Sequence, residues 1–251
     1  MQAYALPAEV YGAGLIFVRI SSLVMLLPGI GDATVPPRIR LAFALVLSIA
    51  LWPVVRAGMP PIPETVGGLA SQVIVEALIG LGLGALLRMF LGTLAVAGEV
   101  ISIQTTLAFS QTANPMQAQP GTSLSVFLAL LGTTLIFTTN LHHLFLAGMV
   151  RSYTLFPIGG RFPLTDFAAL SVRGFSESFA LGIQLAAPVI VFSLVFNIAV
   201  GFVARVMPQF QVFFVATPLS VLLGLSIFAL SLGTLGLVWL DRYRAFVDQF
   251  V

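Results

Sequence analysis

The sequence predicts an all-α integral membrane protein, and three observations carry that prediction. Of the 251 residues, 59% are hydrophobic and only 8% are charged, and the mean hydropathy is +1.07. A soluble domain usually carries about 25% charged residues, so this chain cannot cover a surface that faces water. The apolar residues also gather into about six blocks, most of them near or above the roughly 20 residues that a spanning helix needs.

Proline-rich turns bound the first three blocks. The first block, 10–30, is separated from the second, 39–55, by the prolines and glycines of 28–37. Pro60-Pro61-Ile62-Pro63 precedes the third block, 66–97. Because such clusters favour turns over helix interiors, each block predicts its own helix. The third block exceeds one crossing, which indicates a tilted helix or an arm of a bent hairpin.

The last three blocks follow the same logic. The fourth block, 124–156, starts after Pro120-Gly121 and ends before Pro157-Ile158-Gly159-Gly160. It is also longer than one crossing, so it predicts a tilted helix or a bent hairpin arm. The fifth block, 179–204, and the sixth, 212–240, are joined by a short connection in which Pro208 should stop a helix.

Small residues recur at a spacing that lets helices approach closely. Gly80 and Gly84 are four residues apart, as are Ser220 and Gly224. In lipid, small residues at this spacing allow the backbones of two helices to come together. Packing within the chain is the simpler interpretation, and contact with partner subunits is the alternative.

Four charged residues lie within or at the edges of apolar blocks: Arg19, Glu76, Arg88 and Glu99. A charge at the centre of a bilayer costs about 2.5–3.5 kcal/mol on insertion scales. Glu76 and Arg88 face different sides of a helix, whereas Arg88 and Glu99 share a face but lie about 16 Å apart along its axis. Since neither pair forms a good local bridge, we expect their partners on other helices or other chains.

Two polar stretches interrupt the apolar pattern. Residues 104–123 read QTTLAFSQTANPMQAQPGTS and carry no charge. This stretch is either a surface loop or an uncharged, deformable segment inside a pore, where soft residues such as Met116 would suit a barrier. The second stretch has the pattern N-x3-G-x3-R-x2-P-Q over 197–209. Its polar groups are costly near a bilayer unless other protein or water receives them.

Composition excludes several kinds of chemistry. The chain has no Cys, and all eleven of its cations are Arg. Thiol nucleophiles, thiolate metal sites, disulfides and lysine Schiff bases are therefore excluded. The net charge of +2 is spread along the chain and predicts no nucleic-acid partner. His142 and His143 are adjacent and would point about 100° apart on a helix, which favours packing or capping over one shared metal ion. No metal and no cofactor is expected.

Three groups of residues resemble the FliR family, whose injectisome relatives are called SctT or SpaR. The first group follows a pattern of the form R…P…G…VP-x-R-x-R, and the last is the N-x3-G-x3-R-x2-P-Q spacing, which is hard to obtain by chance in an apolar chain. The residues that carry the resemblance are Arg19, Pro28, Gly31, Val35, Pro36, Arg38, Arg40, Gly98, Glu99, Gln104, Phe109, Asn114, Pro115, Asn140, His142, Pro157, Ala187, Pro188, Asn197, Gly201, Arg205, Pro208, Gln209 and Pro218.

The resemblance implies a single domain, 1–251, in the gate of a type III export system. Its helical hairpins would resemble a FliP-like unit over 1–160 followed by a FliQ-like unit over 161–251. One copy would assemble with FliP-like and FliQ-like subunits, and with FlhB-like and FlhA-like proteins. The assembly would sit in the bacterial inner membrane, in the flagellar basal body, and would project partly to the periplasmic side, so a simple count of crossings would mislead.

The resemblance also implies two sets of functional residues. The central loop would plug the export channel, with the residues Gln104, Phe109, Ser110, Gln111, Asn114, Pro115, Met116 and Gln117. A second set would pack against other subunits or form a turn at the gate: Arg19, Arg38, Arg40, Glu76, Arg88, Glu99, Asn197, Arg205, Pro208 and Gln209.

The function that follows is a non-enzymatic channel subunit for unfolded flagellar proteins, driven by a separate ATPase and by the proton motive force. Exported polypeptides and membrane lipid would be its other contacts. Two alternatives stay open at the level of sequence. One is a small-solute secondary transporter with a midplane site at Glu76 and Arg88. The other is an intramembrane hydrolase that uses His142 or His143.

Overall fold

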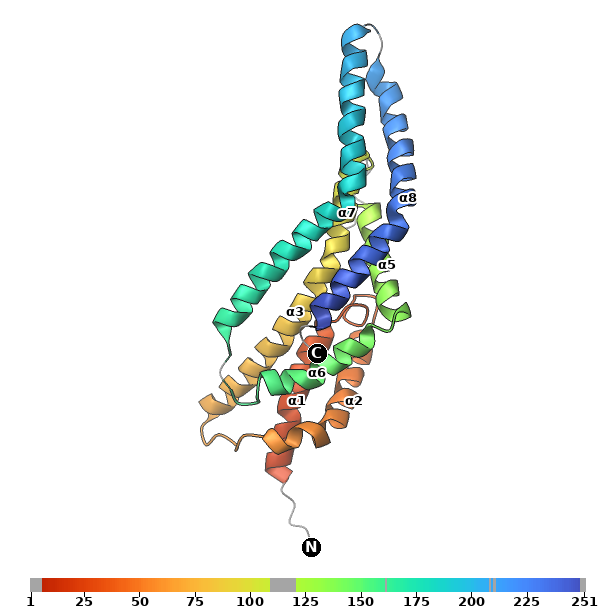
Figure 1. Ribbon diagram of the computed structural model, residues 1–251. Coiled ribbons are helices and arrows are strands. Elements are labelled where there is room, and N and C mark those ends of the chain that lie inside the picture. The colour runs from red at the N-terminus through yellow and green to blue at the C-terminus, as the bar shows by residue number, and fades with distance from the viewer. Residues whose placement is uncertain (1–5, 109–120, 161, 208, 210, 249–251) are drawn as a thin grey trace. The chain divides into compact units, whose positions relative to one another are not determined.

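The structure is a computed structural model, which describes residues 6–108, 121–160, 162–207, 209 and 211–248 (Figure 1). Within those residues every regular element is a helix, which confirms the all-α prediction. The helices are α1 (Leu6–Leu26), α2 (Pro37–Val55), the short 3-10 helix η1 (Arg56–Gly58), α3 (Val66–Gln104), α5 (Ser123–Thr138), α6 (His142–Leu155), α7 (Leu164–Val206) and α8 (Val212–Val247).

The long helices exceed one membrane crossing. In the described part of the chain, five helices are long and apolar enough to span a membrane, and α5 with α6 makes a sixth if that bent pair is one span. With 39 and 43 residues, α3 and α7 have contour lengths of about 58 and 65 Å at 1.5 Å per residue. The hydrocarbon core of a bilayer is about 30 Å thick, so the number of helices does not give the number of crossings.

The two long blocks behave differently. The third block forms one continuous helix, α3. The fourth block is a bent arm, because the α5–α6 pair turns by 76° over a short break. At that break Asn140 has a φ of 60°, a left-handed conformation that ends a helix and that Asn tolerates better than most residues.

Helix α7 begins earlier than the apolar pattern predicts. It starts at Leu164, whereas the fifth apolar block starts at residue 179. Its first turns contain Asp166, Arg173 and Glu177, and these charges interrupt the hydrophobic run without preventing a helix. Helix α7 ends at Val206, two residues before Pro208, in agreement with the helix stop predicted there.

The chain divides into two compact units that interleave along the sequence. The first unit contains the described residues of 1–90, 140–174 and 245–251, and the second those of 91–139 and 175–244. The division into compact units depends on contacts within the chain and says nothing of which other proteins each part resembles. The predicted FliP-like part up to residue 160 and the FliQ-like part after it therefore stay a prediction.

The core of the first unit is built on one stripe of α1. Leu15, Ile16, Ile20, Leu23 and Val24 are all buried, with the three-and-four-residue spacing of a single helix face. Helix α3 lies against this stripe at Gly80 and Gly84. A Cβ at Gly80 would overlap the side chain of Ser22 and the backbone oxygen of Arg19, and one at Gly84 would crowd Leu23. This glycine pair therefore packs within the chain, as the simpler interpretation predicted.

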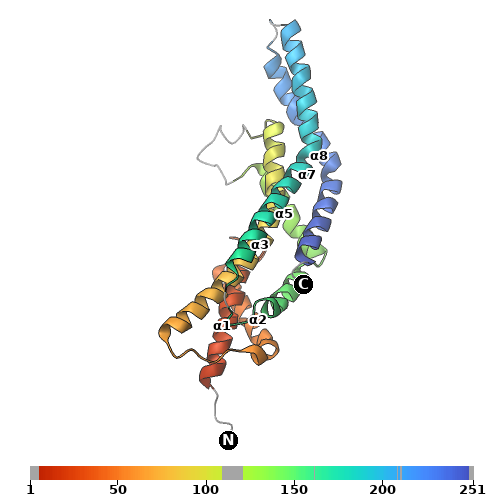
Figure 2. The same ribbon diagram turned by 60° about the vertical axis from the view of Figure 1, so that its left-hand side comes forward.

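The second unit contains a similar close approach and a long hairpin. A Cβ at Gly98 of α3 would overlap the backbone of Ser125 in α5, so these two helices touch through their backbones. The C-terminal half of α7 and the N-terminal half of α8 run side by side in opposite directions, as both Figure 1 and Figure 2 show. Their apolar side chains are largely exposed: Val191, Leu194, Val195, Ile198, Phe202, Val203, Val206, Phe214, Val215, Leu219 and Leu222.

Replacing Gly80 by Ala is expected to destabilise the protein, because backbone atoms of α1 occupy the space that a Cβ needs. Overpacked sites typically lose about 1–3 kcal/mol. The apparent melting temperature of the detergent-solubilised protein measures the loss. Gly92→Ala in the same helix is the matched control, since a Cβ there meets nothing within 4 Å. Equal melting temperatures for the two variants would contradict the close packing of α1 on α3.

Candidate functional site

A buried ion pair joins three helices of the first unit. Arg19 Nε of α1 donates to Glu76 Oε2 of α3 at 2.6 Å, and neither side chain is more than 1% exposed. Arg19 Nη1 donates to the backbone oxygen of Ser152 in α6 at 3.1 Å. The Tyr153 ring covers the guanidinium, with 4.3 Å between Arg19 Cζ and the ring centroid, a cation–π geometry. The charge of Arg19 is thus satisfied by α3 and α6 together.

Two polar atoms of this pair have no hydrogen bond, namely Arg19 Nη2 and Glu76 Oε1, and both are buried. A buried pair is stable only while both charges are present, because removing one leaves the other uncompensated. For Glu76 the prediction of a partner on another helix is confirmed here. A role for Arg19 and Glu76 at contacts with other subunits stays a prediction.

The loop between α1 and α2 is held by two more arginines. Arg40 Nε donates to the backbone oxygen of Val35 at 3.1 Å, and Arg40 Nη1 donates to that of Gly31 at 3.4 Å. Arg88 Nη2 lies 3.5 Å from Asp32 Oδ1, with both side chains partly exposed. An exposed ion pair of this kind contributes roughly 0–1 kcal/mol to the free energy of unfolding, so its effect on the stability of the fold is small. Arg38 is exposed at the start of α2.

Glu99, near the end of α3, forms hydrogen bonds with residues at the start of α5, where the uncharged stretch ends. Its Oε1 accepts from the backbone N–H of Thr122 at 2.7 Å and from Ser125 Oγ at 2.9 Å. Ser102 Oγ donates to Thr122 Oγ1 at 2.9 Å, and Thr122 caps α5 by accepting from the backbone N–H of Ser125. The end of α3 and the start of α5 are therefore tied together by polar contacts.

Most residues of the predicted plug lie outside the described part of the chain: Phe109, Ser110, Gln111, Asn114, Pro115, Met116 and Gln117. Gln104 is described, and its Oε1 accepts from Ser193 Oγ of α7 at 2.8 Å. Asn197 Nδ2 donates in turn to Ser193 Oγ at 3.3 Å. Gln104 is therefore held by α7 at the end of α3, and the plug itself stays a prediction.

The end of α7 and the connection to α8 present their polar residues outward. Asn197, Arg205 and Gln209 are exposed, while Pro208 lies outside the described residues. A Cβ at Gly201 would meet nothing within 4 Å, so this glycine leaves an open surface on α7. Charged and amide groups on an otherwise apolar hairpin fit contact with water or with another protein.

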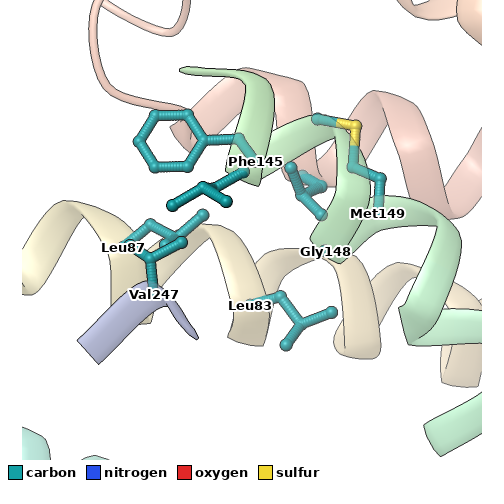
Figure 3. Close-up of a pocket in the computed structure, with 8 residues that line it drawn as sticks. Leu83, Leu87, Phe145, Gly148, Met149 and Val247 are labelled. Carbon is teal, nitrogen blue, oxygen red and sulfur yellow. The ribbon is translucent and has the colours of Figure 1, made fainter. Parts of the chain in front are cut away.

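No metal centre is evident among the described residues, and the enclosed cavity of the first unit is too small for a ligand. The described residues contain no group of three or more His, Cys, Asp or Glu that could hold a metal ion. The His142 and His143 rings lie 4.2 Å apart in a tilted arrangement. A cavity of about 20 Å³ in the first unit, shown in Figure 3, is lined only by apolar residues such as Leu83, Phe145 and Val247. Pockets for small molecules usually measure about 300–1,000 Å³.

Sequence reasoning missed the side chains that complete these polar clusters. Tyr153, Ser193 and Asp32 carry no local signal, because their partners are distant in the sequence. Thr122 could have been found, since Thr before an apolar run is a recognised helix cap.

Comparison with known proteins gives consistent matches. The profile of a family described as "Bacterial export proteins, family 1" matches residues 10–246. The "Flagellar biosynthetic protein FliR" of Caulobacter vibrioides is 54% identical over 250 residues, covering 100% of both chains. Proteins of the same name from Aquifex aeolicus and Escherichia coli are 30% and 31% identical over 93% and 84% of this chain, and 90% and 80% of their own lengths.

Replacing Glu76 by Ala is expected to lower stability by about 3–5 kcal/mol, because it leaves the Arg19 guanidinium buried without its counter-charge. The apparent melting temperature in detergent again reports the loss. The double variant Arg19→Met with Glu76→Met should recover much of it, since no charge is then buried. Glu64→Ala is a control on an exposed carboxylate. Strictly additive losses in the double variant would contradict a coupled ion pair.

Proposed function

The chain belongs to the FliR family of bacterial export proteins, and on that basis we propose that it is a membrane subunit of the flagellar export channel. The observation that carries the proposal is 54% identity over the full length to a flagellar biosynthetic protein. The protein is membrane-embedded, as its long apolar helices require. In the proposed role it sits in the inner membrane at the flagellar basal body, projects partly to the periplasmic side, and lets unfolded flagellar proteins cross.

The partners in this proposal are unlike membrane subunits of the FliP, FliQ, FlhB and FlhA types. The exposed apolar side chains of α7 and α8 support it, because only 17% of the most apolar window in each helix is buried within the chain. Lipid or protein must cover such a surface. Exposed Arg205 and Gln209 at the connection between the two helices suit a contact with protein better than one with hydrocarbon.

The uncharged stretch between α3 and α5 is proposed as the plug of the channel. Its two ends are tied by Glu99, Ser102 and Thr122, so the stretch between them would be a loop with fixed ends. A plug without charge forms no ion pair with dissolved ions or with a passing polypeptide. No ion pair therefore has to break when the plug moves. Closing a loop between fixed ends also limits the conformations available to it.

The structure provides no support for a small-solute transporter. That hypothesis needs Glu76 and Arg88 as a substrate site, yet Glu76 is fully buried in its pair with Arg19. Arg88 lies beside Asp32 at the loop between α1 and α2. We propose a non-enzymatic role: the chain would supply a path, and other proteins would supply the energy. Replacing both His142 and His143 by Gln should leave export intact, and loss of export would favour the hydrolase hypothesis instead.

Deleting residues 109–116 is expected to open an ion leak while the gate still assembles, because the proposed plug would no longer fill the channel. Conductance of membranes that contain the complete gate measures the leak, and co-purification of the other subunits checks assembly. Unchanged conductance together with unchanged export would count against a plug in this stretch.

Replacing Glu99 by Leu is expected to raise the leak less strongly than the deletion, since it removes the acceptor for Thr122 and Ser125 but keeps the stretch itself. Glu99→Gln is the matched control, because its amide oxygen can still accept both hydrogen bonds. The same conductance assay applies. An equal leak from both variants would show that the carboxylate charge, rather than the tie between α3 and α5, matters.

A further inference from the structure

The C-terminal end of α3 packs closely against α7 and α8. Thr105, the residue that follows α3, is fully buried, and its hydroxyl donates to the backbone oxygen of Ile101 at 2.8 Å. A Cβ at Gly224 of α8 would overlap the methyl carbon of Thr105 and would lie 3.7 Å from the Phe192 ring of α7. Because only a residue without a Cβ leaves this space, Gly224 allows the three helices to meet here.

A polar contact lies at the neighbouring residue of α3. Ser193 of α7 is buried, and its Oγ donates to Gln104 Oε1 at 2.8 Å. Asn197 Nδ2 donates to the same Oγ at 3.3 Å, so the hydroxyl acts as donor and acceptor at once. The hairpin of α7 and α8 therefore holds two successive residues, Gln104 through Ser193 and Thr105 at Gly224.

The next residue, Thr106, has a left-handed backbone with a φ of 62°. This conformation is unfavourable for residues with a Cβ, and it is a clear outlier for a β-branched residue. Glycine is the usual residue where a helix ends in this way. Thr106 Oγ1 is also buried, and it has no hydrogen-bond partner among the described residues. A residue keeps so unfavourable a conformation only where its surroundings impose it.

Neither the local sequence nor the local hydrogen bonds impose the end of α3. No Gly and no Pro occurs between Gln104 and Pro115, so the sequence carries no helix breaker at this point. The backbone N–H of Thr106 donates to the oxygen of Ile103 at 3.2 Å. In a right-handed continuation it would donate to the oxygen of Ser102 instead, so no hydrogen bond is gained by the left-handed form. What remains is the pair of contacts with the hairpin at the two preceding residues.

We infer that Ser193 and Gly224 are positioning residues, which hold Thr106 in its left-handed conformation and so fix where α3 ends. Once these contacts are broken, residue 106 takes a right-handed backbone and α3 lengthens beyond Gln104. The α7–α8 hairpin is thus coupled to the end of α3. The inference concerns the second unit alone; its consequence for export, that the hairpin sets where the proposed plug begins, rests on the proposed function.

Replacing Thr106 by Gly or by Ala tests the conformation of residue 106, because both variants lack the buried hydroxyl. A left-handed backbone favours Gly over Ala, whereas a helix favours Ala over Gly. The apparent melting temperature of the full chain in mild detergent should therefore be higher for Thr106→Gly than for Thr106→Ala, by about 2–4 °C. An equal or lower value for Thr106→Gly would overturn the inference, because residue 106 would then not be held left-handed.

The role of the hairpin is tested by making the same two replacements in a Ser193→Ala background. Loss of the hydroxyl releases Gln104, so the advantage of Gly over Ala should disappear or change sign. Gly224→Ala, which displaces Thr105, is a second background with the same expected result. Ser226→Ala is the matched control, since that exposed hydroxyl bonds only to the backbone of its own helix. An advantage of equal size in all three backgrounds would show that the hairpin does not impose the conformation.

Motility of each variant strain is recorded separately, because melting temperature does not report export. An unchanged advantage of Gly in strains that still swim would refute the coupling and leave the export proposal standing. The expected melting temperatures in a chain that proves unnecessary for export would support the coupling and overturn only the proposed function.

Discussion

The buried pair of Arg19 and Glu76 is the constraint on which the packing of the first unit depends. In a chain this apolar, two charges without water around them are stable only beside one another, and further hydrogen bonds to the pair add to that stability. The pair therefore requires α1, α3 and α6 to meet at one place, where Ser152 and Tyr153 complete the surroundings of the guanidinium. Gly80 allows the approach, because any side chain there would overlap α1.

Polar contacts also join the helices of the second unit, but these contacts are hydrogen bonds and not a buried ion pair. Glu99 accepts a hydrogen bond from Thr122, the N-cap of α5, and so joins α5 to the end of α3. Ser193 of α7 donates a hydrogen bond to Gln104. In both units these particular polar groups are turned inward, while large apolar side chains remain outside. A surface of that kind is stable only under lipid or other subunits.

The class of the fold, the positions of most helices and the close packing at Gly80 could be predicted from the sequence, because they depend on composition and on local spacing. The pairings could not: Arg19 and Glu76 are 57 residues apart, and no local pattern selects one buried carboxylate over another. The early start of α7 was missed because Asp166, Arg173 and Glu177 interrupt an apolar block without breaking a helix. The bend at Asn140 was one of two alternatives, and only the left-handed backbone of that residue decides between them.

The central claim is that this chain completes its surface with unlike subunits around a path for polypeptides. The most direct measurement is the mass of the intact particle, obtained by native mass spectrometry after purifying an affinity-tagged chain from its own membranes in mild detergent. We predict a particle that retains several different membrane subunits in a fixed ratio. A well-folded particle made of this chain alone, whether one copy or several, would contradict the claim.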